Sequence, residues 1–254
     1  MLQRSIPDFL KIFLKGIAYR LYILSEKFFK GPFDKYDFQT IQVFRKKLSR
    51  NSNCIDIGAN AGHILREIIK AAPAGKHLAF EPIPVLFSSL QKKYSNRATL
   101  YNYALSDKEG TVSFTWYKDR PAVSGFKERK YLGQSNIAVI DVQTKKLDDL
   151  VPPDMKIDLV KIDVEGAEWQ VLQGAVQTLQ RNKPLVLLET GMGGADEYNT
   201  TPEQLYDLLA GCGLSISILD YYLTNRPPFS REEFCGQFYK GYNWFFIAYD
   251  AAGN

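Results

Sequence analysis

Short apolar runs alternate with helical patterns along the chain from about residue 52 onward. This alternation is typical of βαβ units, in which parallel strands form one sheet between layers of helices. The predicted strands are Cys54–Ile57, His77–Phe80, Thr99–Ala104, Ile157–Ile162, Leu185–Glu189, Ser215–Leu219 and Trp244–Tyr249. The predicted helices lie near residues 61–72, 84–94, 167–181 and 202–211. The pattern therefore indicates an α/β fold with a doubly wound sheet of seven strands.

Residues 111–143 break this rhythm, because their apolar positions alternate with polar ones. We predict two strands here, Val112–Trp116 and Ile137–Val142, which form an inserted hairpin. The polar, basic loop Lys118–Ser135 joins them. A second long connection, Tyr221–Asn243, is rich in aromatic residues, whose rings stack on sugar faces or bury apolar tails. We expect these two connections to determine the substrate specificity, and we expect the aromatic connection to form a lid over the acceptor.

The N-terminal arm, residues 1–50, precedes the main domain, residues 51–254. Its apolar residues recur at steps of three and four, the period of one helical face. They are Ile6, Phe9, Leu10, Phe13, Leu14, Ile17, Leu21, Leu24 and Phe28. Lys11, Lys15 and Arg20 interrupt the pattern too often for a membrane span. We predict that the amphipathic helix within residues 1–31 packs on its own domain or on a second copy in a homodimer; contact with an anionic membrane surface is the alternative.

The charge of the chain is unevenly distributed. Residues 1–50 carry 11 Lys and Arg against 4 Asp and Glu, whereas the remaining residues carry 21 against 24. A nucleic-acid-binding protein is expected to carry its basic excess on the folded body that contacts phosphates. Here only the arm is basic, which argues against DNA or RNA as a partner.

Cysteine and histidine are too sparse for a structural zinc site. Three cysteines are scattered along 254 residues, and the two histidines are His63 and His77. Unpaired cysteines suit a reducing compartment. We therefore expect a cytoplasmic protein, peripheral to the inner face of the membrane if the arm binds lipid.

A ligand-binding loop follows the first predicted strand in the sequence DIGANAG, residues 56–62. Gly58 allows the backbone to bend close to a ligand, and Gly62 allows a helix to start beside it. The amides at a helix N-terminus attract a carboxylate or phosphate. Glu81 ends the second strand 19 residues beyond Gly62, where a carboxylate can accept hydrogen bonds from both hydroxyls of a ribose.

The loop favours S-adenosylmethionine over a dinucleotide. In a GxGxxG pattern that starts at Gly58, Asn60 and His63 occupy the second and third glycine positions. The loop also begins with an acid, Asp56, which requires backbone amides or a cationic ligand if it is buried. S-adenosylmethionine carries an ammonium, a carboxylate and a ribose but no phosphate. A nicotinamide-dependent oxidoreductase remains an alternative.

A second group of ionisable residues follows the fourth predicted strand, in LVKIDVEGAE, residues 159–168. Lys161 and Asp163 share one face of the strand end, and Glu165 reaches the turn. Groups this close perturb one another's pKa values, as catalytic groups do. We assign Asp163 and Glu165 to function, although an ion pair of Lys161 with Asp163 also suits stability. Glu168 suits the first turn of a helix.

Together these motifs resemble the FkbM family of S-adenosylmethionine-dependent methyltransferases. The resemblance runs from about residue 52 to 190 and is weaker to the C-terminus. It rests on DIGANAG, FEP (residues 80–82), ALSD (104–107), LDDL (147–150) and LVKIDVEGAEWQVLQGA (159–175). It implies a class I methyltransferase fold, Rossmann-like with the last strand antiparallel. It also implies O-methylation, often of a sugar or polyketide hydroxyl.

The resemblance also implies roles for individual residues. Four would line the methionine part of the cofactor: Asp56, Gly58, Asn60 and Gly62. Glu81 would hold the ribose, and Ser106 with Asp107 would lie near the adenine. Asp163 and Glu165 would face the reacting centre.

The expected reaction transfers a methyl group to a hydroxyl of a glycan or small natural product. One carboxylate, Asp163 or Glu165, would act as general base, while Lys161 orients it or stabilises a developing alkoxide. We expect no metal, because the acids are not clearly grouped; a divalent ion on Asp163 and Glu189 is the alternative. An alternative hypothesis is that the protein is a non-catalytic adaptor, which binds a membrane or a partner through residues 1–31.

Overall fold

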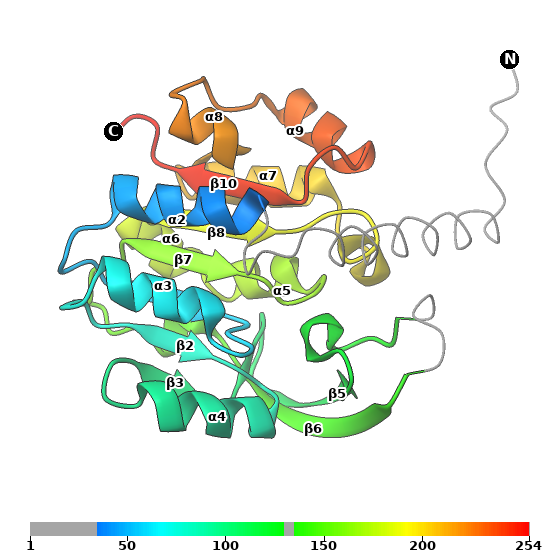
Figure 1. Cartoon of the computed structure of the whole chain (residues 1–254). Coiled ribbons are helices and arrows are strands. Elements are labelled where there is room, and N and C mark those ends of the chain that lie inside the picture. Colours follow the sequence, from blue (N-terminus) through cyan, green and yellow to red (C-terminus); the bar gives the residue numbers. More distant parts are fainter. Residues whose placement is uncertain (1–34, 130–134, 254) are drawn as a thin grey trace, which may run out of the picture.

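The computed structural model describes residues 35–129 and 135–253. Its centre is a seven-stranded sheet in the order β3-β2-β1-β7-β8-β10-β9. The strands are β1 (Cys54–Ile57), β2 (Leu78–Phe80), β3 (Thr99–Tyr101), β7 (Leu159–Ile162), β8 (Leu185–Glu189), β9 (Ser215–Ile218) and β10 (Phe245–Tyr249). β10 is antiparallel to both of its neighbours, and the other pairs are parallel. This arrangement is the class I methyltransferase sheet, which confirms the predicted fold (Figure 1).

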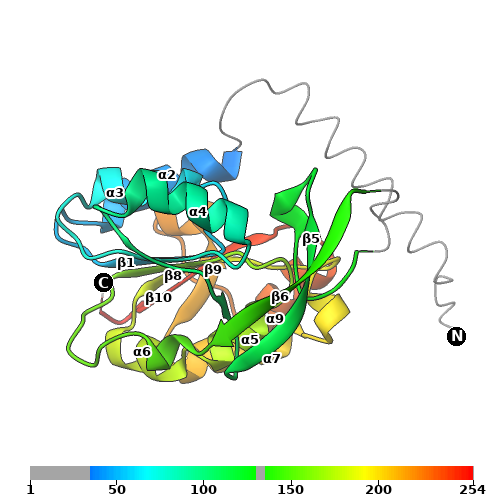
Figure 2. The same ribbon diagram turned by 90° about the horizontal axis from the view of Figure 1, so that it is seen from below.

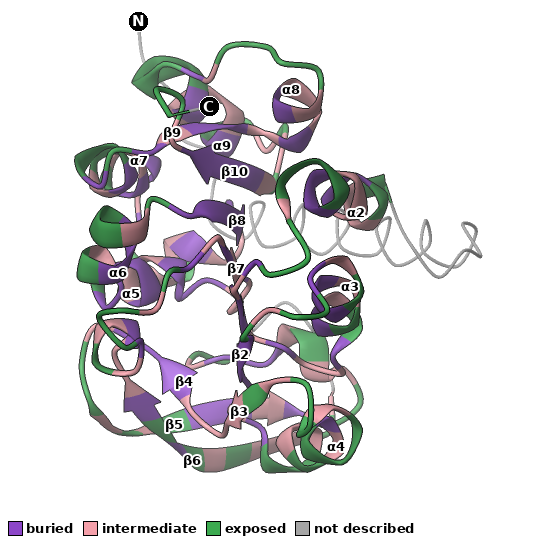
Figure 3. Cartoon of the chain, turned by 90° about the vertical axis from the view of Figure 1, so that its left-hand side faces the viewer, coloured by how far each residue is buried: buried purple, intermediate pink, exposed green. Residues whose placement is uncertain are grey.

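Helices cover both faces of the sheet (Figures 2 and 3). One layer contains α2 (Lys35–Lys47), α3 (His63–Ala71) and α4 (Pro84–Tyr94), and the opposite layer contains α5 (Glu168–Gln173), α6 (Val176–Asn182) and α7 (Pro202–Gly211). α8 (Leu219–Leu223) packs on α2, and α9 (Arg231–Tyr239) packs on α7. Short 3-10 helices are η1 (Pro121–Val123), η3 (Leu147–Asp149) and η4 (Ala195–Tyr198).

The central strands β1, β2, β7 and β8 are buried on both faces, which explains why their sequences are nearly continuous apolar runs. Ile55, Val160 and Val186 are fully buried in the core that includes α5 and α7. α2 lies within the predicted arm, and its Val43 and Phe44 are buried in the core on the other face. This described part of the arm therefore contributes directly to the folded body.

The inserted hairpin is present as β5 (Gly110–Tyr117) and β6 (Ile137–Lys145), which pair antiparallel over their full length. A two-residue strand, β4 (Ala104–Leu105), pairs parallel with β6 and completes a second, three-stranded sheet. The chain then folds back over the hairpin through a bridge between Thr115 and Gly125. The hairpin stands beyond the carboxyl ends of the parallel strands of the main sheet (Figure 1).

The amphipathic helix predicted within residues 1–31 lies outside the described residues, so its packing or lipid contact stays a prediction. Within residues 35–129 and 135–253, no helix combines the length and the apolar character needed to cross a membrane.

Candidate functional site

Three residues of the loop after β1 lie in the left-handed region of backbone conformation, and two of them are glycines. Gly58, Asn60 and Gly62 have φ angles of 76°, 47° and 82°. A Cβ atom on Gly58 would lie 1.9 Å from the carbonyl oxygen of Asp163, so the loop packs directly against the end of β7. A Cβ atom on Gly62 would likewise lie 2.7 Å from the Cδ2 atom of Leu90 on α4. The loop is therefore held between the ends of β1 and β7 on one side and α4 on the other.

Glu81 supports this loop from the end of β2. Its side chain accepts hydrogen bonds from the backbone amide of Asn60 at 2.7 Å and from that of Ile83 at 2.8 Å. Burial raises the pKa of Glu81 to about 7, although these two amides oppose the shift. A carboxylate offers about four lone-pair sites, so capacity for hydroxyl donors remains after these two bonds. The predicted ribose-binding residue thus also fixes the shape of the predicted methionine-binding loop.

Lys161 is the electrostatic centre of the site. Its ammonium lies 3.1 Å from Asp163 Oδ2 and 3.5 Å from Asp56 Oδ1, and it donates to the carbonyl oxygen of Gly58 at 3.0 Å. Burial opposes the charged form, but the carboxylates of Asp163 and Asp56 outweigh it and raise the pKa of Lys161 above its ordinary value. One side chain therefore connects β1, its glycine loop and the end of β7.

Asp56 and Asp163 differ in exposure, although they share this ammonium. The side chain of Asp56 is 0% exposed, whereas that of Asp163 is 29% exposed. Burial raises the pKa of Asp56, and Lys161 opposes the shift. Asp56 lies opposite Lys161 in the β1–β7 register, which explains their contact. Asp163 is thus the member of the pair that a substrate can reach.

Glu165 lies on a strained turn that Arg129 holds in place. Its φ angle is 59°, in the left-handed region. Arg129 Nη2 donates to the backbone carbonyl oxygen of Glu165 at 2.8 Å and lies 2.5 Å from its Oε2. Burial raises the pKa of Glu165 to about 8, and the Arg129 guanidinium opposes this. Glu168 supports the same turn, because it accepts from the amides of Val164 and Gly166.

Glu189 ends β8 beside this group. Burial raises its pKa well above the ordinary value, and the nearby carboxylates of Asp163 and Glu165 add to the shift. Among the residues that the structure describes, no three His, Cys, Asp or Glu side chains form a group suited to a metal ion.

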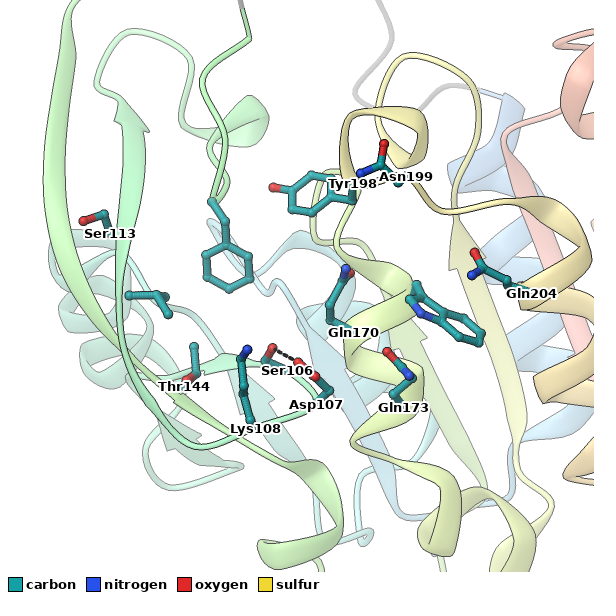
Figure 4. Close-up of a pocket in the computed structure, with 13 residues that line it drawn as sticks. Ser106, Asp107, Lys108, Ser113, Thr144, Gln170, Gln173, Tyr198, Asn199 and Gln204 are labelled. Carbon is teal, nitrogen blue, oxygen red and sulfur yellow. Dashed lines mark hydrogen bonds between the residues drawn. The ribbon is translucent and has the colours of Figure 1, made fainter.

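Ser106 and Asp107 are not among the residues that contact Lys161. Ser106 Oγ donates to Asp107 Oδ1 at 2.9 Å, and both line a pocket of about 520 Å³ beside the hairpin (Figure 4). No other predicted site residue lines this pocket. The structure thus joins Asp56, Gly58, Lys161 and Asp163 in one cluster and leaves Ser106 and Asp107 in another.

The predicted aromatic lid, Tyr221–Asn243, is largely core. Its buried rings are those of Tyr222, Phe229, Phe234 and Phe238. Tyr239 and Tyr242 are 53% and 62% exposed, and Tyr221 is half-buried, so these three rings are available to a ligand.

Comparison with known proteins identifies the family. The profile described as "Methyltransferase FkbM domain" matches residues 56–216. "Methyltransferase sdnD" of Sordaria araneosa is 30% identical over 159 residues, which are 50% of this chain and 61% of sdnD. "2-O-methyltransferase NoeI" of Sinorhizobium fredii is 26% identical over 149 residues, 51% of this chain and 59% of NoeI. The chain thus spans about 60% of the length of these two relatives.

Solved structures resemble the chain more distantly. The structure titled "Methyltransferase FkbM" from Methylobacillus flagellatus has a TM-score of 0.48 and 16% identity, over 80% of this chain and 44% of that one. Because the family profile covers more than half of the chain, family membership rests on that match. The chain belongs to the FkbM methyltransferase family.

Proposed function

We propose that this protein is an S-adenosylmethionine-dependent O-methyltransferase that acts on a hydroxyl of a glycan or a small natural product. Family membership supports methyl transfer, and a relative named as a 2-O-methyltransferase supports a hydroxyl acceptor. The observation that carries the proposal is the Lys161 cluster. It joins the loop after β1, the predicted cofactor loop, to the carboxylate of Asp163 through contacts of 3.0 and 3.1 Å.

The residues around the loop fit the proposed cofactor. α3 begins at His63, and its N-cap residue Gly62 provides no side-chain cap, so the amides of the first turn are suited to the cofactor carboxylate. Asp163, the exposed carboxylate beside Lys161, would supply negative charge toward the ammonium and the sulfonium, whereas the buried Asp56 holds Lys161 in place. Glu81 keeps lone pairs for the ribose hydroxyls beyond its two amide bonds. When bound, the sulfonium supplies an electrophilic methyl group.

We assign the general base to Asp163 rather than to Glu165. Arg129 holds both the backbone carbonyl oxygen of Glu165 and one oxygen of its carboxylate, so this side chain is fixed in an ion pair. Asp163 is more exposed and is oriented by Lys161 Nζ. In the proposed step, Asp163 would accept the proton of the acceptor hydroxyl as the acceptor oxygen receives the methyl group that the sulfonium supplies.

Ligand binding tests this proposal without knowledge of the acceptor. Isothermal titration of the full chain with S-adenosylhomocysteine should give a one-to-one complex, whereas NAD should give no measurable heat of binding. Binding of NAD but not of S-adenosylhomocysteine would replace the proposal with the oxidoreductase reading. Incubation with methyl-labelled S-adenosylmethionine and candidate hydroxyl acceptors should then transfer the label to oxygen.

A further inference from the structure

The pocket of about 520 Å³ lies between the inserted hairpin and the helical layer of α5 and α7. Figure 4 shows Ser113 and Thr144 on the hairpin side, Gln170 and Gln173 on α5, and Tyr198 above them. The walls therefore come from segments that are far apart in the sequence. The hairpin insertion supplies one wall of this open pocket.

The lining is nearly neutral and combines rings with amides. Phe126, Trp169 and Tyr198 provide aromatic surface, and Gln170, Gln173, Asn199 and Gln204 provide amide groups. The charged residues of the lining are Asp107 and Lys108, which are adjacent and of opposite sign. Rings pack on the C–H faces of a saturated ring, and amides both donate to and accept from hydroxyls. This lining suits an uncharged ligand with many hydroxyls.

One buried acceptor in the lining needs a partner. Gln170 Oε1 is shielded from solvent and has no hydrogen-bond partner among the described residues. An unsatisfied buried acceptor is destabilising, by about 1–3 kcal/mol. A small rotation of the Gln170 amide into the pocket would give this oxygen a ligand hydroxyl as its partner.

The pocket adjoins the turn that carries the candidate catalytic carboxylates. A Cβ atom on Gly166 would lie 2.8 Å from the ring of Tyr198, so the Tyr198 wall packs against this turn. The Thr115–Gly125 bridge also anchors the short segment that follows Gly125, and this segment contributes to the pocket and to the turn of Glu165. Phe126 in this segment lines the pocket, and Arg129, three residues later, holds Glu165. The pocket therefore shares a wall with the turn that carries Glu165.

We propose that this pocket binds a neutral sugar ring of the acceptor, in place of the adenine expected near Ser106 and Asp107, and that Gln170 and Phe126 determine which ring is accepted. The assignment rests on the proposed function for its link to methyl transfer, but sugar binding itself does not require that reaction. The ring packs on Phe126, and its hydroxyls bond to the amide of Gln170 and its neighbours.

The test is titration of isotope-labelled full-length protein, saturated with S-adenosylhomocysteine, with methyl glucoside, galactoside, mannoside and rhamnoside, followed by NMR. At least one glycoside should bind with a Kd in the millimolar range. Cyclohexanol, which has one hydroxyl, should bind more weakly. Gln170→Leu should weaken glycoside binding about threefold to tenfold, the usual effect of losing one neutral hydrogen bond. Phe126→Ala should weaken it at least as much.

Matched controls separate the pocket from general effects of substitution. Gln177→Leu changes an exposed glutamine on α6, and Phe38→Ala changes a phenylalanine that is 56% exposed on α2. Neither control should alter glycoside binding, and all four variants should keep the wild-type affinity for S-adenosylhomocysteine. If Phe126→Ala loses that affinity, Phe126→Leu takes its place.

Three results would overturn the assignment: no glycoside binds, S-adenosylhomocysteine competes with the glycoside, or both pocket variants bind like the controls. Failure of S-adenosylhomocysteine to bind would instead count against the proposed function. The glycoside titration would then be performed on the free protein.

Discussion

Replacement of Lys161 with Met tests the electrostatic centre of the site. The substitution keeps most of the aliphatic side chain and removes the ammonium that contacts Asp163 at 3.1 Å and Asp56 at 3.5 Å. Asp163 can then be hydrated, because its side chain is 29% exposed. Asp56 cannot, because its side chain is 0% exposed. The variant therefore leaves one carboxylate buried without its cation.

The expected loss of stability is large for a single substitution. Removal of one partner from a buried ion pair costs about 3–5 kcal/mol, and we expect a decrease of this size in the free energy of unfolding at pH 7. The raised pKa of Lys161 means that its contribution is present at all pH values below its ordinary pKa. Burial already raises the pKa of Asp56, so proton uptake by Asp56 at low pH should reduce the loss.

Urea denaturation monitored by circular dichroism, at pH 5 and pH 7, measures this loss. Lys70→Met is the matched control, because Lys70 is 62% exposed in a surface pair with Glu67 and should cost less than about 1 kcal/mol. The double variant Asp56→Asn/Lys161→Met should recover more than half of the loss. A cost for Lys161→Met equal to that of the surface control, or one that does not depend on pH, would refute the reasoning.

Three further predictions concern the carboxylates. Burial raises the pKa of Glu168 from 4.5 to about 7, so the folded state binds its proton more tightly and this contribution to stability is lost as pH rises from 4.5 through 7. In urea denaturation of Glu168→Gln, the unfolding free energy should therefore differ less between pH 5 and pH 8 than in the wild type, by up to about 3 kcal/mol. Equal differences in the two proteins would contradict this. Glu81→Ala should raise the Kd for S-adenosylhomocysteine at least about tenfold in calorimetry; equal affinity would remove Glu81 from the cofactor site. Asp163→Asn should reduce turnover by about a hundredfold or more with cofactor affinity kept, whereas Glu165→Gln should retain activity. The opposite result would move the base to Glu165.

The strand pattern was predictable because each central strand is buried on both faces and therefore reads as an apolar run. The interruptions within the predicted strands and helices were harder to predict from the sequence. The predicted strand Thr99–Ala104 divides at Asn102, whose side-chain amide donates to the carbonyl oxygens of Glu81 and Pro82. The predicted helix 167–181 divides at Gly174, where a Cβ atom would lie 2.1 Å from the carbonyl oxygen of Ser106. Both breaks depend on contacts with distant segments, which a local pattern does not contain.

In the candidate site, too, contacts within one segment could be predicted from the sequence, whereas contacts between distant segments could not. The contact of Lys161 with Asp163 could be expected, since the two residues share one face of a strand end. Arg129 could not be singled out, because it is one of several basic residues in a polar loop. It reaches Glu165, 36 residues away, through the fold of the inserted hairpin. Nor does the spacing of Glu81 reveal that two backbone amides already occupy part of its carboxylate.

A crystal structure with S-adenosylhomocysteine shows whether the loop after β1 and Glu81 hold the cofactor. We predict that the amino acid part of this product lies along residues 58–62, that its ribose hydroxyls contact Glu81, and that its sulfur faces Asp163. A product bound elsewhere, or a loop and a Glu81 carboxylate without contact to it, would refute this assignment of the cofactor site.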